Sequence, residues 1–313
     1  HVRRKQMNKE RNASDSACKK ILRNNECFAD LCNIVYFQGK QVIKPENLFS
    51  QENDLSTLIG KELLSMETKR YRDIVRKANI NGTYMIIGVE HQSSVDKEMI
   101  YRILNYDALL YKNQVESKKE VQPVGTFVFY TGDKEWTYPD SLKGTLKNIP
   151  PEMEKYINDW RFPVLDIKKI DFTKLRNQHL RDIVEISQGM YQGSYEGLRV
   201  NRMVQLESIK IAAIFTHTDI NEEDLPEGDE INMCKAMDQL FQRLRDEGME
   251  RGESIGIEKG KLNTLKEQLQ IKLGDLSNNL EEQLTKASLD KLEVLTVNIF
   301  NINSEEDVLK IIN

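Results

Sequence analysis

Apolar positions divide the chain into a part that contains strands and a helical part that follows it. Residues 15–37 carry apolar side chains at three- and four-residue steps, which predicts a helix. Gly39 is expected to end this helix, because glycine readily adopts the conformation that terminates helices. A short strand at about 41–44 and a polar, irregular stretch to about residue 66 are expected next.

Two runs, 69–80 and 83–92, are joined by the dipeptide Asn81-Gly82. Both turn residues tolerate a positive φ, as the two-residue turn of a β-hairpin requires. The second run is continuously apolar over 84–89, which is typical of a central strand covered on both faces. The pattern therefore predicts a buried β-hairpin.

The remaining elements follow in a simple order. A helix is expected directly after the hairpin, with Ser93 to Asp96 as its capping box. Strands are expected at 124–130 and 163–167. From about residue 171 the pattern changes to helices, which we expect at 173–190, 198–216 and 229–272, with two or three short ones up to residue 312.

Composition fits a folded protein with one good-sized core and a smaller appendage, since 39% of the 313 residues are hydrophobic and 30% are charged. No run approaches the ~20 apolar residues that span a bilayer, so we expect a cytoplasmic protein without membrane contact. The four cysteines have neither zinc-site nor disulfide spacing, and reduced thiols are expected. Residues 1–14 are expected to be disordered or an artefact of cloning.

Charge is distributed unevenly along the chain, whose net charge is -5. Residues 1–120 carry 21 Lys and Arg against 16 Asp and Glu, and the remainder carries 24 against 34. Such an asymmetry is compatible with phosphate binding confined to one face of the first part.

The hairpin turn fixes which residues face each other. If Asn81 and Gly82 form the turn, the numbers of paired residues sum to 163, so Asp73 lies opposite Glu90. Gln92 projects on the same face as Glu90 because side chains alternate along a strand. Like charges directly opposed are destabilising unless neutralised, and a divalent cation would neutralise them. A bulge in either strand would shift this pairing.

Several groups of residues together resemble those of a known family. They are Asp73, Glu90-His91-Gln92-Ser93-Ser94, Asp96, Met99, Arg102, Tyr106 and the segment from Val128 to Trp136. In these residues the chain resembles the recombination-promoting nuclease (Rpn) family, also described as putative transposases, of the PD-(D/E)XK nuclease superfamily. The resemblance covers roughly residues 25–170 closely and the helical tail only in style.

The resemblance implies an α/β fold with a restriction-endonuclease-like αβββαβ core and a mixed central sheet, followed by a helical C-terminal region. We accordingly expect a nuclease domain at 15–170 and a helical region at 171–313. Within the latter, the helix at 229–272 contains Gly248, Gly252, Gly256 and Gly260 at four-residue steps. This helix is either a self-association helix, giving a homodimer or higher homo-oligomer, or a loose linker, and both alternatives stay open.

The resemblance also implies a Mg²⁺-dependent DNA endonuclease, with Mn²⁺ as a substitute metal, that promotes recombination or acts on mobile DNA. Asp73 and Glu90 would hold the metal through oxygen atoms. Gln92 stands where the superfamily usually has lysine; it supplies no positive charge to the transition state. We therefore expect a slow enzyme. The alternative is a DNA-binding or assembly protein that keeps the nuclease fold without useful turnover.

Further residues receive expected roles beside these three. Asp30 is expected to add an acidic metal contact, and Arg72 and Arg76 are expected to contact phosphate. For Arg102, a phosphate contact and a structural salt bridge to Glu90 or Asp96 are both open. His91 alternates to the opposite face from Glu90, where a packed or hydrogen-bonded side chain is expected. No glycine-rich phosphate loop, Ser-His-Asp set or zinc spacing occurs in the sequence.

Overall fold

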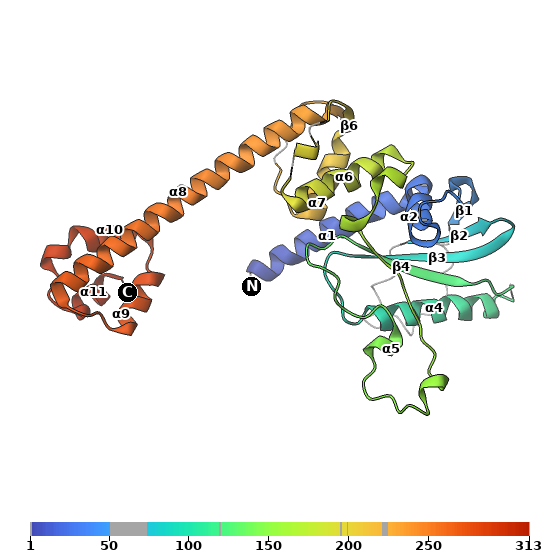
Figure 1. The fold of residues 1–313 in the computed structure, drawn as a ribbon, viewed down its shortest axis with the longest axis horizontal. Helices are drawn as coiled ribbons and strands as arrows, with labels where there is room; N and C mark the ends of the chain where they lie inside the picture. Colours follow the sequence, from blue (N-terminus) through green and yellow to red (C-terminus); the bar gives the residue numbers. More distant parts are fainter. Residues whose placement is uncertain are drawn as a thin grey trace. The chain divides into compact units, whose positions relative to one another are not determined.

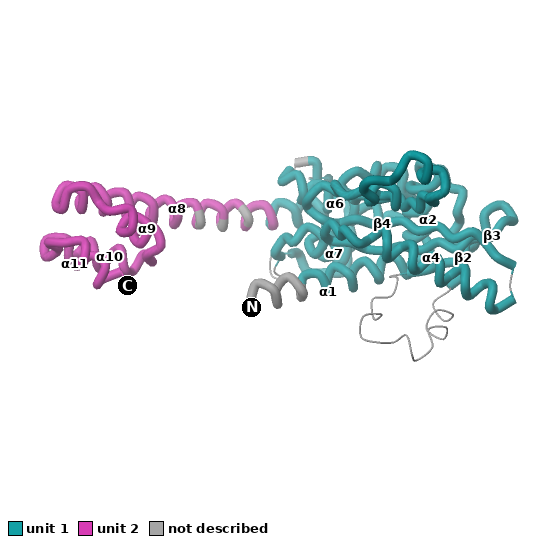
Figure 2. Tube along the Cα trace, turned by 90° about the horizontal axis from the view of Figure 1, so that it is seen from below, with its two compact units in different colours: residues 1–239 teal, residues 240–313 magenta. Residues whose placement is uncertain are grey.

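The computed structural model describes residues 2–50, 74–118, 120–194, 196–198, 200–220 and 225–312. The chain divides into two compact units, residues 1–239 and residues 240–313 (Figure 2). Each unit has its own hydrophobic core, and each is described by itself.

A mixed five-stranded sheet, in the order β1-β2-β3-β4-β5, forms the centre of the first unit. The first three strands are antiparallel, and β4 and β5 continue the sheet parallel to β3. The strands are β1 (Leu48–Ser50), β2 (Ile74–Ile80), β3 (Thr83–Gln92), β4 (Val124–Tyr130) and β5 (Val164–Asp166). The α/β class, the mixed sheet and the central position of β3 are as expected.

Helices cover both faces of this sheet (Figure 1). One face packs on α4 (Met99–Glu116), through a cluster that contains Val128 and Tyr130. The other face contributes Val89 and Phe129 to the main core, which is completed by four helices. These are α1 (Val2–Arg23), α2 (Asn25–Phe37), α6 (Gln178–Gln192) and α7 (Leu206–Thr216). Alternate residues of β3 and β4 thus face two different helical layers.

The predicted hairpin is confirmed. Asn81 has φ 51° and Gly82 has φ 90°, both in the left-handed region that the two-residue turn requires. Strands β2 and β3 pair one to one from Ile80↔Thr83 to Ile74↔Val89, without a bulge. The register is therefore the one on which the predicted site depends.

The helix expected at 15–37 is two helices. Asn24 lies between them, and its side-chain oxygen accepts hydrogen bonds from the backbone N–H groups of Glu26 and Cys27, as an N-cap does. Residues 2–14, expected to be disordered, belong to α1, and Ser14 at the inner side of that helix is fully buried. Gly39 follows the end of α2 with φ 87°, in agreement with its expected role.

Two local expectations are wrong. No strand forms at 41–44; the chain instead makes a single 3₁₀ turn, η1 (Pro45–Asn47), and the edge strand β1 follows it. The capping box at Ser93 to Asp96 does not form, because α4 begins at Met99 and its N-cap Glu98 makes no side-chain cap. Asp96 instead accepts a hydrogen bond from the backbone of Glu98 at 2.9 Å.

The first unit extends past the boundary expected at residue 170. Leu180 and Ile183 of α6 and Phe215 of α7 belong to the same core cluster as Val89 of the sheet. The helices expected at 198–216 and 229–272 begin later than predicted: α7 begins at Leu206 and α8 (Met233–Leu273) at Met233, and the residues before them form an antiparallel ribbon of β6 (Met203–Gln205) and β7 (Glu230–Asn232). Shorter elements are α5 (Leu142–Thr145), η2 (Glu154–Tyr156), η3 (Ile167–Lys169), η4 (Phe172–Lys174) and η5 (Glu196–Leu198).

The second unit is helical. It contains the last part of α8 (Met233–Leu273) and three short helices, as expected, whose leucine-rich core includes Leu265, Leu269, Leu284 and Leu295. The three are α9 (Asn278–Lys286), α10 (Leu289–Val297) and α11 (Glu305–Ile312), with η7 (Ile299–Asn301) before the last. None of the described helices is long and apolar enough to cross a membrane.

Candidate active site

The predicted site residues Glu90 and Gln92 lie at the carboxyl end of the central strand β3. Their side chains are almost completely buried, with 1% and 4% of their surface exposed. In the parallel ladder Glu90 pairs with Val128, and Gln92 pairs with Tyr130. Because Val128 and Tyr130 pack under α4, Glu90 and Gln92 face the α4 side of the sheet. A carboxylate and an amide therefore converge on one face, as expected.

The proposed partners before β2 lie outside the described residues. Asp73, expected to oppose Glu90, and Arg72, expected to contact phosphate, precede Ile74, where the described strand begins. The last described pair of the hairpin is Ile74↔Val89. The opposition of Asp73 and Glu90 stays a prediction.

Arg102 supplies the positive charge that Glu90 meets in the structure. This arginine projects from the first turn of α4, with its Nη2 3.1 Å from Glu90 Oε2 and its Nη1 2.7 Å from Asp96 Oδ2. Burial acts to lower the pKa of Arg102, but attraction to Glu90 and the hydrogen bond to Asp96 outweigh it, so the pKa is raised. Of the two open roles, the structural salt bridge is present, and it links Glu90 and Asp96 at once.

Two other predicted residues make structural contacts. Asp30, on α2, accepts hydrogen bonds at 2.7 Å from the backbone N–H groups of Arg176 and Asn177, and so anchors the start of α6. Arg76 is buried at 5% exposure, with its Nη1 3.2 Å from the carbonyl oxygen of Val75. These contacts account for both side chains within the fold, and the metal and phosphate roles expected for them remain predictions.

Tyr130 and Asp166 extend the site region along the carboxyl ends of the parallel strands, and the Lys168 ammonium lies 3.7 Å from Asp166 Oδ1; sequence reasoning gave none of the three a site role. Tyr130 pairs with Gln92 on one side and with Asp166 on the other, so all three share a face. Asp166 Oδ2 is buried without a hydrogen-bond partner among the described residues. Burial, aided by repulsion from the Asp166 and Asp133 carboxylates, raises the pKa of Tyr130 to about 12. The sequence signals were the segment Val128 to Trp136, which contains Tyr130, and an acidic residue in the strand expected at 163–167.

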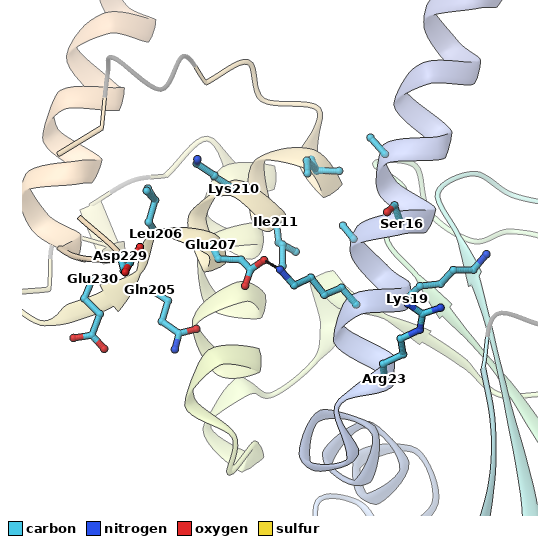
Figure 3. A pocket seen from close by; sticks show the side chains of 14 residues that line it. Ser16, Lys19, Arg23, Gln205, Leu206, Glu207, Lys210, Ile211, Asp229 and Glu230 are labelled. Atoms are coloured by element: carbon cyan, nitrogen blue, oxygen red, sulfur yellow. Dashed lines mark hydrogen bonds and ion pairs between the residues drawn. The ribbon is translucent and has the colours of Figure 1, made fainter. Parts of the chain in front are cut away.

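A hollow of about 1220 Å³ lies elsewhere in the first unit, along α1 and α7 (Figure 3). Basic side chains of α1, among them Lys19 and Arg23, line one part of it, and acidic side chains, among them Asp229 and Glu230, line another. None of the predicted site residues that the structure describes lines this hollow. Because its lining carries both signs of charge, electrostatics does not favour a phosphate backbone there.

Donor chemistry defines what the β3 site can hold. Glu90 and Gln92 offer oxygen donors, which hard cations such as Mg²⁺ prefer. Within the described ranges, no group of three or more His, Cys, Asp and Glu side chains could hold a metal ion. The described residues thus provide half of the expected carboxylate pair, and a full site needs the contribution predicted for Asp73.

Comparisons with known proteins agree with the resemblance drawn from the site residues. The chain is 24% identical over 167 residues to "Recombination-promoting nuclease RpnC" of Escherichia coli (strain K12), a match that covers 46% of this chain and 55% of that protein. The chain thus spans about half the length of this curated relative. No solved structure matches it significantly. A family profile described as "Putative transposase, YhgA-like" matches residues 52–210, about half of the chain, and the chain therefore belongs to this family.

Proposed function

We propose that this protein is a Mg²⁺-dependent DNA endonuclease with a PD-(D/E)XK-type site built on the β2–β3 hairpin. The similarity to a protein named as a recombination-promoting nuclease supports the reaction class. The order of elements supports the restriction-endonuclease-like core, since helices α1 and α2 are followed by β1, β2, β3, α4 and β4. DNA is the proposed substrate, and promotion of recombination or action on mobile DNA is the proposed role.

The observation that carries the proposal is the buried carboxylate of Glu90 on the same strand face as Gln92. An ionised carboxylate this deeply buried is costly without a cation beside it. Arg102 fills that place in the structure, at 3.1 Å. A divalent cation held by Glu90 and Asp73 would neutralise the same buried negative charge.

Each residue has a distinct part in the proposed reaction. Glu90 and Asp73 would hold the metal, which when bound supplies Lewis-acid activation of the scissile phosphate and of a water molecule. Gln92 would orient water or phosphate by hydrogen bonding. Arg102, held by its bond to Asp96, would offer its positive charge to the phosphate.

One observation favours a second candidate function, a DNA-binding or assembly protein without useful turnover. Glu90 is already neutralised by Arg102, and Gln92 brings no positive charge of its own. A protein in which this ion pair never opens would keep the fold and lose the chemistry. The two candidates differ in whether a divalent ion displaces Arg102.

The proposal is tested by incubating supercoiled plasmid with the full chain and Mg²⁺ or Mn²⁺. We expect slow, metal-dependent nicking that is abolished in Asp73→Ala and in Glu90→Gln. Glu116→Gln is the matched control, because Glu116 is an exposed carboxylate at the last residue of α4 that pairs with Lys112. Equal cleavage by Asp73→Ala would reject the catalytic assignment. DNA binding without cleavage under any divalent ion would favour the second candidate.

A further inference from the structure

His91 lies on β3 between the two site residues Glu90 and Gln92. Its side chain projects to the opposite face of the sheet, where it is 2% exposed. There it packs against aromatic rings, with ring-centroid distances of 5.8 Å to Phe215 and 6.4 Å to Phe129. A polar ring in such surroundings must find hydrogen-bond partners, since an unsatisfied buried polar group is destabilising.

Both ring nitrogens of His91 have partners, and the partners come from two different elements. Nδ1 lies 2.9 Å from Asp15 Oδ1 on α1, and Nε2 lies 2.8 Å from Thr131 Oγ1 just after β4. A carboxylate only accepts, so in the neutral ring Nδ1–H donates to Asp15 and Nε2 accepts from the Thr131 hydroxyl. Ser14 Oγ lies 3.5 Å from Nε2. The ring therefore ties β3 to α1 and to the end of β4.

Thr131 contacts β3 a second time and is itself held from outside the sheet. Its backbone N–H donates to the carbonyl oxygen of Gln92 at 2.9 Å. Its own carbonyl oxygen accepts a hydrogen bond from the hydroxyl of Tyr191 on α6 at 2.5 Å. The ammonium of Lys168 bonds to the next three carbonyl oxygens of the loop, those of Gly132, Asp133 and Lys134.

A Ser-His-Asp arrangement is superficially similar, but the burial of the hydroxyls argues against nucleophilic catalysis here. Ser14 and Thr131 are both 0% exposed. A substrate carbonyl or phosphate would have to reach a nucleophile within the main core. The network connects elements of the fold and has no access to substrate.

We propose that His91 is a positioning residue, which through Asp15 and Thr131 fixes the carboxyl end of β3 so that Glu90 keeps its metal-binding geometry and Gln92 its place beside it. Strand alternation supplies the mechanism, because a rotation of β3 that displaced Glu90 would also displace His91 from its two partners. This inference rests on the proposed function and deepens it by naming what holds the site in place. Removal of one hydrogen bond on the far face should therefore weaken metal binding on the near face.

Substitutions at Thr131 test the proposal in the full chain. Thr131→Val removes the hydroxyl while keeping the shape, and Thr131→Ser restores it. Ile183→Val is the matched control, since it removes one buried methylene from the same core cluster without touching the network. Mn²⁺ affinity, measured by calorimetry, and the melting temperature are determined for the wild type and for each variant.

We expect Thr131→Val to raise the Mn²⁺ dissociation constant about tenfold, as loss of a supporting hydrogen bond typically does. Thr131→Ser should recover most of the affinity, and Ile183→Val should leave it unchanged although its melting temperature falls. Equal affinities in Thr131→Val and the wild type, or a loss of affinity in Ile183→Val that matches its loss of stability, would overturn the positioning role.

If the wild type bound no Mn²⁺, the proposed function would be rejected. Hydrogen exchange would then test the positioning role by itself. Amide exchange over residues 89–92 should then rise in Thr131→Val relative to that over residues 84–87, and remain unchanged in Ile183→Val. If Thr131→Val changed amide exchange equally over residues 84–87 and 89–92, the positioning role would be overturned independently of any metal.

Discussion

At the residue scale, the ion pair between Arg102 and Glu90 explains how the buried carboxylate of Glu90 is tolerated in the fold. Glu90 is 1% exposed, and its charge is met by a guanidinium that also binds Asp96. Removal of one partner of such a pair leaves the other charge buried and uncompensated. The stability of the metal-free protein should therefore depend on Arg102.

Arg102→Met should lower the free energy of unfolding by roughly 3 kcal/mol in EDTA. Added Mg²⁺ should return part of this loss, because the cation would replace the missing positive charge beside Glu90. Denaturant unfolding with and without Mg²⁺ measures both effects. Lys112→Met, which removes an exposed pair with Glu116, is the control and should change stability by less than about 0.5 kcal/mol. Equal behaviour of the two variants would mean that Glu90 does not need Arg102.

The hydrogen bond between Asp15 and His91 should make the stability of the fold depend on pH. Burial acts to raise the pKa of Asp15, but the hydrogen bond and the attraction to His91 outweigh it, so the pKa lies below its ordinary value of 3.8. A carboxylate with a lowered folded-state pKa stabilises the fold above its unfolded-state pKa, and this contribution is lost as the pH falls through the lower value. As the pH falls from about 5 to about 3, the free energy of unfolding should thus decrease less in Asp15→Asn than in the wild type. Parallel stability curves for the two proteins would contradict the lowered pKa.

Several residues of the site region could be placed from the sequence alone. Counting from Asn81-Gly82 gave the register of the hairpin, and alternation along β3 placed Glu90 and Gln92 on one face and His91 on the other. The partners of His91 could not be found this way. Asp15 and Thr131 lie on other elements, and no local pattern shows which elements meet across a core.

At the scale of elements, the turn of the β2–β3 hairpin sets the geometry of the site. Gly82 has φ 90°, where an L side chain is strained, and nothing lies within 4 Å of an added Cβ. Gly82→Ala should therefore lower the free energy of unfolding by about 1 to 2 kcal/mol through backbone strain alone. Asn81→Gly should cost little, since glycine accepts a positive φ. Thermal unfolding of both variants checks this, and a neutral Gly82→Ala would contradict the turn type.

Helices were easier to anticipate than short strands. The long apolar stripes of α4 and α6 were recognised. Strands β6 and β7 have three residues each, too few for an alternation of apolar and polar residues to be detected. The break at Asn24 was missed because the apolar stripe continues through both α1 and α2. Capping by the Asn24 side chain, a local effect, overrides the continuity of the stripe.

The four glycines of α8 provide a test of what this helix does. A Cβ added at Gly248, Gly252, Gly256 or Gly260 meets no atom within 4 Å. Replacement of all four by alanine should raise helix stability by up to about 1 kcal/mol per site, because interior glycine is unfavourable in a helix. Circular dichroism measures the gain in helicity. Light scattering then separates the two open alternatives, since a smaller mass in the variant indicates self-association through the glycines and an unchanged mass indicates a linker.

At the scale of the whole molecule, the division into two units differs from the expected domains. The change from strands to helices near residue 171 is real, but α6 and α7 complete the core of the first unit, which extends to residue 239. Secondary-structure content alone could not show this, because a helix that covers a sheet and a helix that forms a separate bundle have the same periodicity. Composition indicated one good-sized core and a smaller appendage, and the helices of the second unit enclose a core of their own.

Direct titration with Mn²⁺ tests the central claim, that Glu90 contributes to a divalent-cation site on the central hairpin. The wild type should bind one Mn²⁺ per chain at the β3 site. Glu90→Gln should lose this binding while keeping its fold, because the amide preserves the shape of the side chain and removes its charge. Undiminished Mn²⁺ affinity in a folded Glu90→Gln variant would contradict the metal site and with it the proposed nuclease chemistry.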